Sequence, residues 1–291
     1  MAPKKSIPYL LILPIVLLYG IFIGGGLIGI VQESLGHIPV IGLEGFTMKY
    51  YRLIISQKYF IKSFLYSIYI ASAAAVIATV LGVMIAYAFV MCQSKSIQRI
   101  VKKALQFGLI LPYLYGIFLA MILLNQTGFF ARLLYNTGVI RESASFPELI
   151  FDRKAIGIIW VFVFKGTPFI ALFVMNVMAR IGNTYGDVAR SLGSGSLTIL
   201  RKIYLPLSSN SIIWTSSIIF AYALGSFEVN YLLSSISPVP ISAKLYSLFI
   251  HPDLTVIPQT MALSVMLFVI GVSLVGVYSF LLRFVLKGRA G

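Results

Sequence analysis

The sequence has few of the residues on which disulfide-stabilised, metal-binding and catalytic proteins depend. One cysteine, Cys92, and two isolated histidines, His37 and His251, stand in 291 residues. A single cysteine cannot form an internal disulfide, and no Cys/His cluster has metal-ligand spacing. The sequence therefore predicts no metal site. It also lacks the nucleophile or carboxylate constellation that an integral-membrane enzyme would need.

Charged residues are also scarce. They make up 11% of the chain, whereas a soluble domain carries about 25%. Hydrophobic residues reach 59%, mean hydropathy is +0.96, and several apolar runs are long enough to span a bilayer. These values exclude a soluble enzyme or a disordered binder. They predict an all-α integral membrane protein in which residues 1–291 form a single transmembrane domain.

A phosphate cradle is missing as well. The pattern G-x-x-x-x-G-K-[ST] occurs nowhere in the sequence. The chain is therefore expected to bind no ATP, to require no cofactor and to be no enzyme itself. Energy for any active process is expected to come from another subunit.

The apolar runs predict six transmembrane helices, the third of them broken by Pro112. The spans cover residues 8–31, 64–91, 105–124, 155–178, 209–233 and 257–285. The first run follows Lys4 and Lys5 and is too long for a signal peptide, and no small-x-small cleavage site follows it, so we interpret it as a retained span. Six spans place both termini on one side.

The distribution of basic residues sets the predicted orientation. The net charge is +15. Lysines and arginines gather in residues 4–5, 95–103, 180–202 and 283–289, where Asp187 is the one acid. By the positive-inside rule, these segments and both termini are cytoplasmic. The charge is then expected to contact anionic membrane lipids and not nucleic acid.

The most informative polar stretch lies between the fourth and fifth spans, within residues 179–208. Asp187 stands near the start of a short helical run, where the helix dipole favours an acid, and Gly193 permits the left-handed turn that ends it. A second helical run covers residues 196–204, and Pro206 marks the transition into the next span. The pattern predicts helix, glycine turn, helix. An amphipathic connector resting on the membrane has the same pattern.

The order of residues in this stretch resembles the EAA motif of permease subunits of ABC importers. That motif has an acid, two alanines, a glycine and then Ile-x-Leu-Pro. Its counterparts in this sequence are Asp187, Val188, Ala189, Gly193, Ile203, Leu205 and Pro206. Aspartate in place of glutamate and Val188 in place of alanine are departures that bear on how the loop seats on a partner.

The resemblance extends beyond the motif. The six-span plan, the position of the loop after the fourth span, and Phe227-Glu228-Val229 are similar to MetI-like permeases of the polyamine, ferric-iron, phosphonate and thiamine importers. It implies a type I importer permease in the bacterial plasma (inner) membrane. The implied function is ATP-driven, binding-protein-dependent import of a small charged solute.

The same resemblance implies a set of partners. Residues 179–208 would be a coupling loop seated on ATP-binding cassette subunits, which bind and hydrolyse the ATP. A second permease subunit, homologous or identical, would complete the path. An extracellular or periplasmic solute-binding protein would deliver the substrate.

Two ionisable residues, Lys165 and Glu228, fall inside predicted spans, where a charge is costly unless it faces protein or water. They form a structural ion pair, or they belong to a substrate path with Tyr222 and Asn230 as further candidate contacts, or they have no defined role. A free Glu228 favours a cationic substrate and a free Lys165 an anionic one. The alternative function is a secondary transporter that uses Glu228 and Lys165, although the sequence shows no convincing internal repeat.

Overall fold

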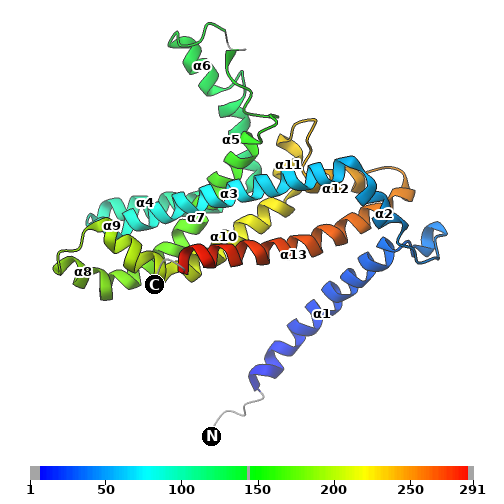
Figure 1. The fold of residues 1–291 in the computed structure, drawn as a ribbon, viewed down its shortest axis with the longest axis horizontal. Helices are drawn as coiled ribbons and strands as arrows, with labels where there is room; N and C mark the ends of the chain where they lie inside the picture. Colours follow the sequence, from blue (N-terminus) through cyan, green and yellow to red (C-terminus); the bar gives the residue numbers. More distant parts are fainter. Residues whose placement is uncertain (1–6, 143–144, 288–291) are drawn as a thin grey trace. The chain divides into compact units, whose positions relative to one another are not determined.

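The computed structural model describes residues 7–142 and 145–287, with backbone alone at 7–11, 183, 184, 187, 190 and 287. Secondary structure in these residues is helical apart from an isolated bridge between Ile38 and Leu43 (Figure 1). Six helical segments are long and apolar enough to cross a membrane, as predicted. They are Ile12–Ser34, Lys58–Met91, Tyr113–Asn136, Ile156–Ile181, Ser196–Gly225 and Leu254–Leu286.

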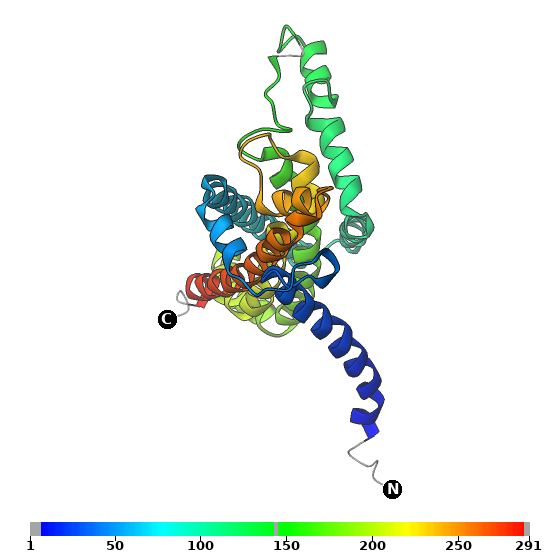
Figure 2. The ribbon, with the colours of Figure 1, turned by 90° about the vertical axis from the view of Figure 1, so that its right-hand side faces the viewer.

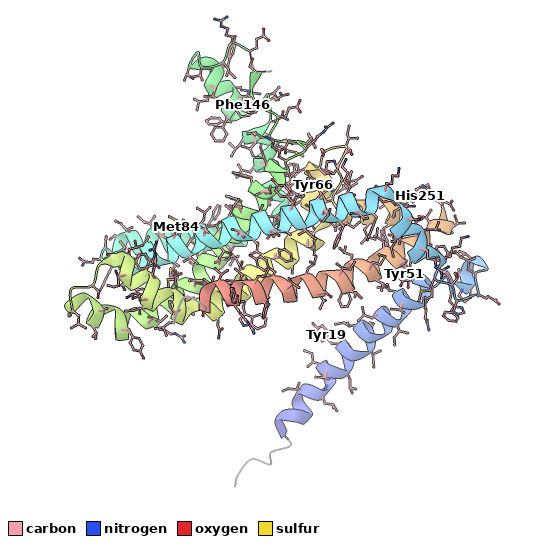
Figure 3. The ribbon with its side chains drawn as sticks, in the orientation of Figure 1. Tyr19, Tyr51, Tyr66, Met84, Phe146 and His251 are labelled. Carbon is pink, nitrogen blue, oxygen red and sulfur yellow. The ribbon has the colours of Figure 1, made fainter. Side chains whose placement is uncertain are left out.

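The chain divides into two compact units, Met1–Phe60 with Leu245–Val269 and Ile61–Lys244 with Ile270–Gly291. The first unit contains α1 (Ile7–Ser34) and α2 (Lys49–Ser56). Tyr51 of α2 lies beside the end of α1 (Figure 3), and its hydroxyl is 2.6 Å from Ser34 Oγ. This bond joins the first span to the segment that follows it.

The second unit is built around α7 (Ile156–Ile181), which α4 (Lys95–Ile110), α5 (Tyr113–Leu124), α10 (Leu205–Gly225) and α11 (Phe227–Leu233) all contact. Glycines allow the closest approaches. A Cβ on Gly82 of α3 (Lys58–Met91) would lie 2.9 Å from Ile170 Cβ, and one on Gly166 would lie 3.2 Å from Ile219 Cγ2. Small residues at such contacts are typical of helix packing in membranes.

Hydrogen bonds between side chains also join the helices of this unit. The Thr79 hydroxyl of α3 donates to Ser216 Oγ of α10 at 2.6 Å. Ser216 Oγ lies 2.7 Å from the Tyr278 hydroxyl of α13 (Ile257–Lys287). Interhelical bonds of this kind add to packing where apolar contact alone gives little driving force.

The predicted third span, residues 105–124, is not one helix. α4 ends at Ile110 and α5 begins at Tyr113, because Pro112 cannot continue a helix and instead caps the next one. The segment apolar and long enough to span is Tyr113–Asn136, made of α5 and α6 (Phe129–Asn136). Part of the predicted outer loop is therefore helical, and α6 extends away from the rest of its unit (Figures 1 and 2).

The predicted fifth span, residues 209–233, differs at both ends. α9 (Ser196–Ile199) runs through a π-helical turn, Leu200–Tyr204, into α10 without a break at Pro206. Pro206 has no N–H to donate, and the wider turn before it accommodates this loss. The helix breaks at Ser226, so α11 is a separate short helix.

The remaining helices are short. They are α8 (Asp187–Ser191), α12 (Ile241–Phe249) and the 3₁₀ turns Pro39–Ile41 and Leu254–Val256. A second π-helical turn, Gly182–Gly186, connects α7 to α8. Figure 1 shows α8 and α9 together near the C-terminal end of α3.

Candidate functional site

Residues 179–208 form the helix, glycine turn and helix that the sequence predicts. α8 ends where Gly193 adopts φ +78°, the left-handed conformation that favours glycine. The N–H of Ser194 donates to the carbonyl of Ala189 at 3.1 Å, and that of Leu192 to the carbonyl of Val188 at 3.1 Å. This is a Schellman-type helix end, so the prediction of a glycine turn at Gly193 is confirmed.

The base of the loop is held by two tyrosines. Tyr204 is fully buried, and its ring meets that of Tyr87 edge-on at 5.5 Å. The Tyr87 hydroxyl donates to the carbonyl of Ser196 at 2.5 Å, which attaches the second limb of the loop to α3. In the first limb, a Cβ on Gly182 would lie 2.9 Å from Tyr204 Oη. Both limbs therefore pack on one buried ring.

The residues of the EAA-like motif do not share one environment. Val188 is exposed, whereas Ala189 is buried in the core. Ile203, Leu205 and Pro206 are partly exposed, and the side chain of Asp187 lies outside the described residues.

The loop exposes apolar side chains among its polar ones. Leu192 is 80% exposed, and Val188 and Leu197 are also exposed. Exposed apolar side chains gathered on a polar loop are typical of a surface that another protein covers. Leu192, Tyr87 and Gly182 were not among the predicted site residues. The signal for Leu192 was present in the sequence, since it stands directly before the turn glycine.

Lys165 lies within α7 and is only 5% exposed. Its ammonium donates to the carbonyl oxygens of Gly108 at 2.8 Å, Leu109 at 3.1 Å and Leu111. It also lies 5.5 Å from the centre of the Tyr113 ring. The last carbonyls of a helix have no partner within the helix and carry partial negative charge. Lys165 therefore satisfies the end of α4 at the Pro112 break.

Glu228 lies elsewhere, in the first turn of α11 after the helix break, and is exposed. It borders a cavity of about 360 Å³ that Tyr222, Ser226 and Phe227 also line. Lys165 and Glu228, both described, form no ion pair, because Lys165 bonds to backbone carbonyls.

Tyr222 belongs to an aromatic cluster beside this cavity. Its ring stacks on that of Tyr113 at 4.5 Å and meets that of Phe162 edge-on at 6.3 Å. Pairs of this geometry favour a fixed ring orientation. The cluster therefore positions an aromatic face at the cavity wall.

Asn230 does not line the cavity. It is fully buried, and its Nδ2 donates to the carbonyls of Ala223 at 3.1 Å and Ser226 at 2.8 Å and to Ser242 Oγ at 2.9 Å. It thereby satisfies the carbonyl end of α10 and holds the break that presents Glu228. Among the described residues, no group of three or more His, Cys, Asp or Glu side chains could hold a metal.

Comparison with known proteins identifies solved structures that share this fold. No protein-family model matches the sequence, and no curated protein matches it. A solved bacterial ABC transporter involved in the import of the acidic polysaccharide alginate contains a chain with TM-score 0.78 and 16% identity, over 94% of both chains. The chain has the fold of an ABC transporter subunit.

A second structure agrees. The alginate ABC transporter in complex with an alginate pentasaccharide-bound periplasmic protein has a chain with TM-score 0.79 and 16% identity, over 96% of this chain and 94% of that one. Neither neighbour is a polyamine, ferric-iron, phosphonate or thiamine transporter, so the comparisons do not support those substrates. In this ABC transporter fold the loop joins α7 to α10, and the Glu228 cavity lies at the other end of α10.

Proposed function

We propose that this chain is the transmembrane permease subunit of an ATP-driven, binding-protein-dependent importer of the bacterial plasma membrane. The observation that carries the proposal is the shared fold with chains of an alginate ABC importer over at least 94% of both chains. The neighbour's periplasmic binding protein supports a solute-binding partner for this chain. A second permease subunit, homologous or identical, completes the proposed path.

The loop at residues 179–208 is the proposed contact with an ATP-binding cassette subunit. Its exposed Val188, Leu192 and Leu197 offer an apolar contact surface at the tip. Tyr204 fixes both limbs, so a displacement of the tip is transmitted to α7 and α10 together. ATP is bound by the partner, and this chain supplies the element that the partner moves.

The Glu228 cavity is the proposed segment of the substrate path. Lys165 is engaged by carbonyls, whereas Glu228 is exposed, so the local charge offered to a solute is negative. We therefore propose a cationic solute and not an acidic saccharide such as alginate. Tyr222 adds an aromatic face, which also attracts cations.

Purification of the chain from its native membrane tests the proposed function. We expect an ATPase subunit to co-purify, and the reconstituted complex to take up solute only when ATP and the binding protein are both supplied. ATP-independent uptake by the chain alone, driven by a proton or sodium gradient, would instead establish a secondary transporter.

The variant Glu228→Gln tests the substrate path. Because a hydrogen bond to a charged group contributes about 1.5–3 kcal/mol, we expect uptake of the cationic solute at low concentration to fall by about tenfold or more. Co-purification of the ATPase is expected to stay unchanged. Glu148→Gln, on an exposed acid that does not line the cavity, is the matched control. Equal uptake by both variants would remove Glu228 from the path.

A further inference from the structure

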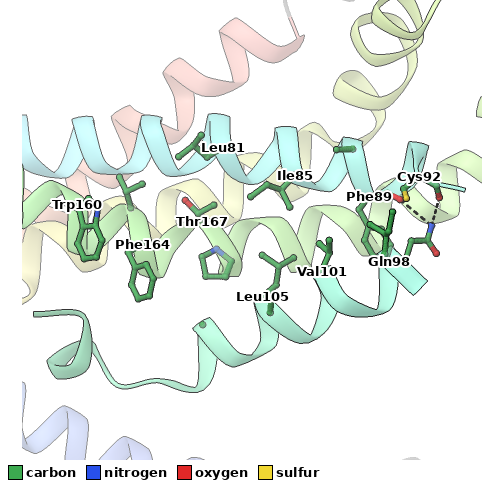
Figure 4. A pocket seen from close by; sticks show the side chains of 16 residues that line it. Leu81, Ile85, Phe89, Cys92, Gln98, Val101, Leu105, Trp160, Phe164 and Thr167 are labelled. Carbon is green, nitrogen blue, oxygen red and sulfur yellow. Dashed lines mark hydrogen bonds between the residues drawn. The ribbon is translucent and has the colours of Figure 1, made fainter. Parts of the chain in front are cut away.

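A cavity of about 750 Å³ lies between α3, α4 and α7 (Figure 4), and neither Glu228 nor any residue of the loop lines it. Its walls are almost entirely apolar, with Gln98, Cys92 and Thr167 as the polar exceptions. Its apolar lining includes Ile85, Phe89, Val101, Leu105, Trp160 and Phe164. Such a cavity accepts a hydrocarbon and no ordinary polar solute.

The dimensions match one lipid chain. At 1.5 Å of rise per residue, the α3 wall from Leu81 to Cys92 is about 17 Å long. One leaflet of the hydrocarbon core is about 15 Å thick, half of the roughly 30 Å of the whole core. The cavity therefore has the length of an acyl chain that enters from one membrane surface.

Basic residues of α4 lie beside one end of the cavity, although none of them lines it. Gln98 closes this end by donating from Nε2 to the carbonyls of Phe89 at 3.2 Å and Cys92 at 2.8 Å (Figure 4). The first turns of α4 lie there, and Lys95, Arg99, Lys102 and Lys103 are all exposed. The helix contains no acid that would neutralise them.

We propose that this cavity binds one acyl chain of an anionic phospholipid, with the phosphate at the basic first turns of α4. An acyl chain gains no hydrophobic energy by moving from bilayer to cavity, so the apolar wall alone selects no lipid. The bases provide the selection, since anionic headgroups are attracted to basic residues at the membrane surface.

The charge of α4 favours a lipid over a protein segment. A transmembrane helix from a second copy of this chain would leave the bases unmatched. The whole chain has only eight acidic residues against 23 lysines and arginines.

The two tryptophans of the chain make the test direct. Trp160 lines the cavity, whereas Trp214 on α10 is 60% exposed and reports on other lipid. Trp214→Phe leaves Trp160 as the sole reporter, and Trp160→Phe leaves Trp214 as its control. Each full-length chain is placed in nanodiscs that contain increasing dibrominated phosphatidylglycerol or dibrominated phosphatidylcholine, and fluorescence quenching is measured.

We expect Trp160 to reach half-maximal quenching at a mole fraction of phosphatidylglycerol about tenfold below that of phosphatidylcholine, because several bases contact the headgroup. Trp214 is expected to show no preference. Replacing Lys95, Arg99, Lys102 and Lys103 by glutamine should abolish the preference, and replacing the three lysines by arginine should preserve it. Ala104→Phe, which fills the cavity from an exposed position of α4, should weaken quenching by both lipids.

Equal quenching of Trp160 by the two lipids overturns the proposal, as does a preference that survives the glutamine variant. A Trp160 that neither lipid quenches identifies a protein segment as the occupant and also overturns it. Size-exclusion profiles and thermal unfolding of each variant establish that the compared chains are folded. The outcome does not depend on the transported solute or on the ATPase partner.

Discussion

Lys165→Met is expected to lower the stability of the purified chain by about 3 kcal/mol while leaving transport per folded molecule largely intact. The substitution removes the donor that serves the carbonyls of Gly108, Leu109 and Leu111. Each buried carbonyl that is left without a donor costs about 1–3 kcal/mol. The total cost for the three carbonyls is partly offset, because the variant no longer has to bury the charge of the lysine. Thermal unfolding in detergent measures the first effect, and uptake normalised to folded protein measures the second.

The two measurements separate a structural lysine from a substrate-path lysine. A path residue would lose uptake even in the folded fraction, with little change in stability. Lys165→Arg is the matched control. It keeps a positive charge, but the planar guanidinium fits the three carbonyls around Lys165 less well than the compact ammonium does. An unchanged unfolding temperature for Lys165→Met would show that the end of α4 does not depend on this side chain.

A double-mutant cycle addresses the ion pair that the sequence left open. Lys165 and Glu228 do not contact each other in the structure, so the stability effects of Lys165→Met and Glu228→Gln should add to within about 0.5 kcal/mol. A coupling energy well above that value would indicate a direct interaction. The cycle requires only stability measurements, so it is independent of the transported solute.

The partner of Lys165 could have been inferred from the sequence by a different route. Depth along a span says how costly a charge is, and it does not say which neighbour the side chain faces. Pro112, however, predicts a break within the third span. A helix that ends inside a membrane leaves carbonyls without partners, and such carbonyls require a donor from another segment. A lysine in the adjacent span is such a donor.

Glu228 and Asn230 show a second limit of predicting substrate contacts from the sequence. Both were predicted to contact the substrate, but they stand two positions apart in α11. Residues at i and i+2 of a helix face different directions, so both could not line one cavity. The structure exposes Glu228 and buries Asn230 against the carbonyl end of α10. Helical geometry alone therefore predicts that at most one is a contact, and packing decides which.

The positions of the spans depend on local sequence properties, whereas their exact ends also depend on tertiary packing. Hydropathy located the six segments, because length and apolar composition are local properties. It misplaced the third and fifth spans, where Pro112 ends a helix and Pro206 does not. The difference lies in the π-helical turn Leu200–Tyr204 and in the buried Tyr204 ring beneath it, neither of which is visible in the hydropathy of the sequence.

Gly193→Pro is expected to abolish association with the ATPase subunit and ATP-dependent uptake, while the chain still inserts and folds. Gly193 has φ +78°, and proline is fixed near −65°, so the turn between α8 and α9 cannot form. A Cβ at this position would meet nothing within 4 Å, so the variant changes backbone conformation without a steric clash. The amount of ATPase that co-purifies with each variant, relative to the chain, is the measurement.

Gly193→Asn is the matched control for that variant. Asparagine also adds a side chain at this position, but it tolerates the left-handed conformation. The turn should therefore survive at a cost of about 1 kcal/mol or less. The pair therefore distinguishes turn geometry from side-chain size. If Gly193→Pro retains the wild-type amount of ATPase and its uptake, the loop at residues 179–208 does not couple this chain to its motor. If Gly193→Asn loses both as well, the open surface at the turn, and not its backbone conformation, makes the contact.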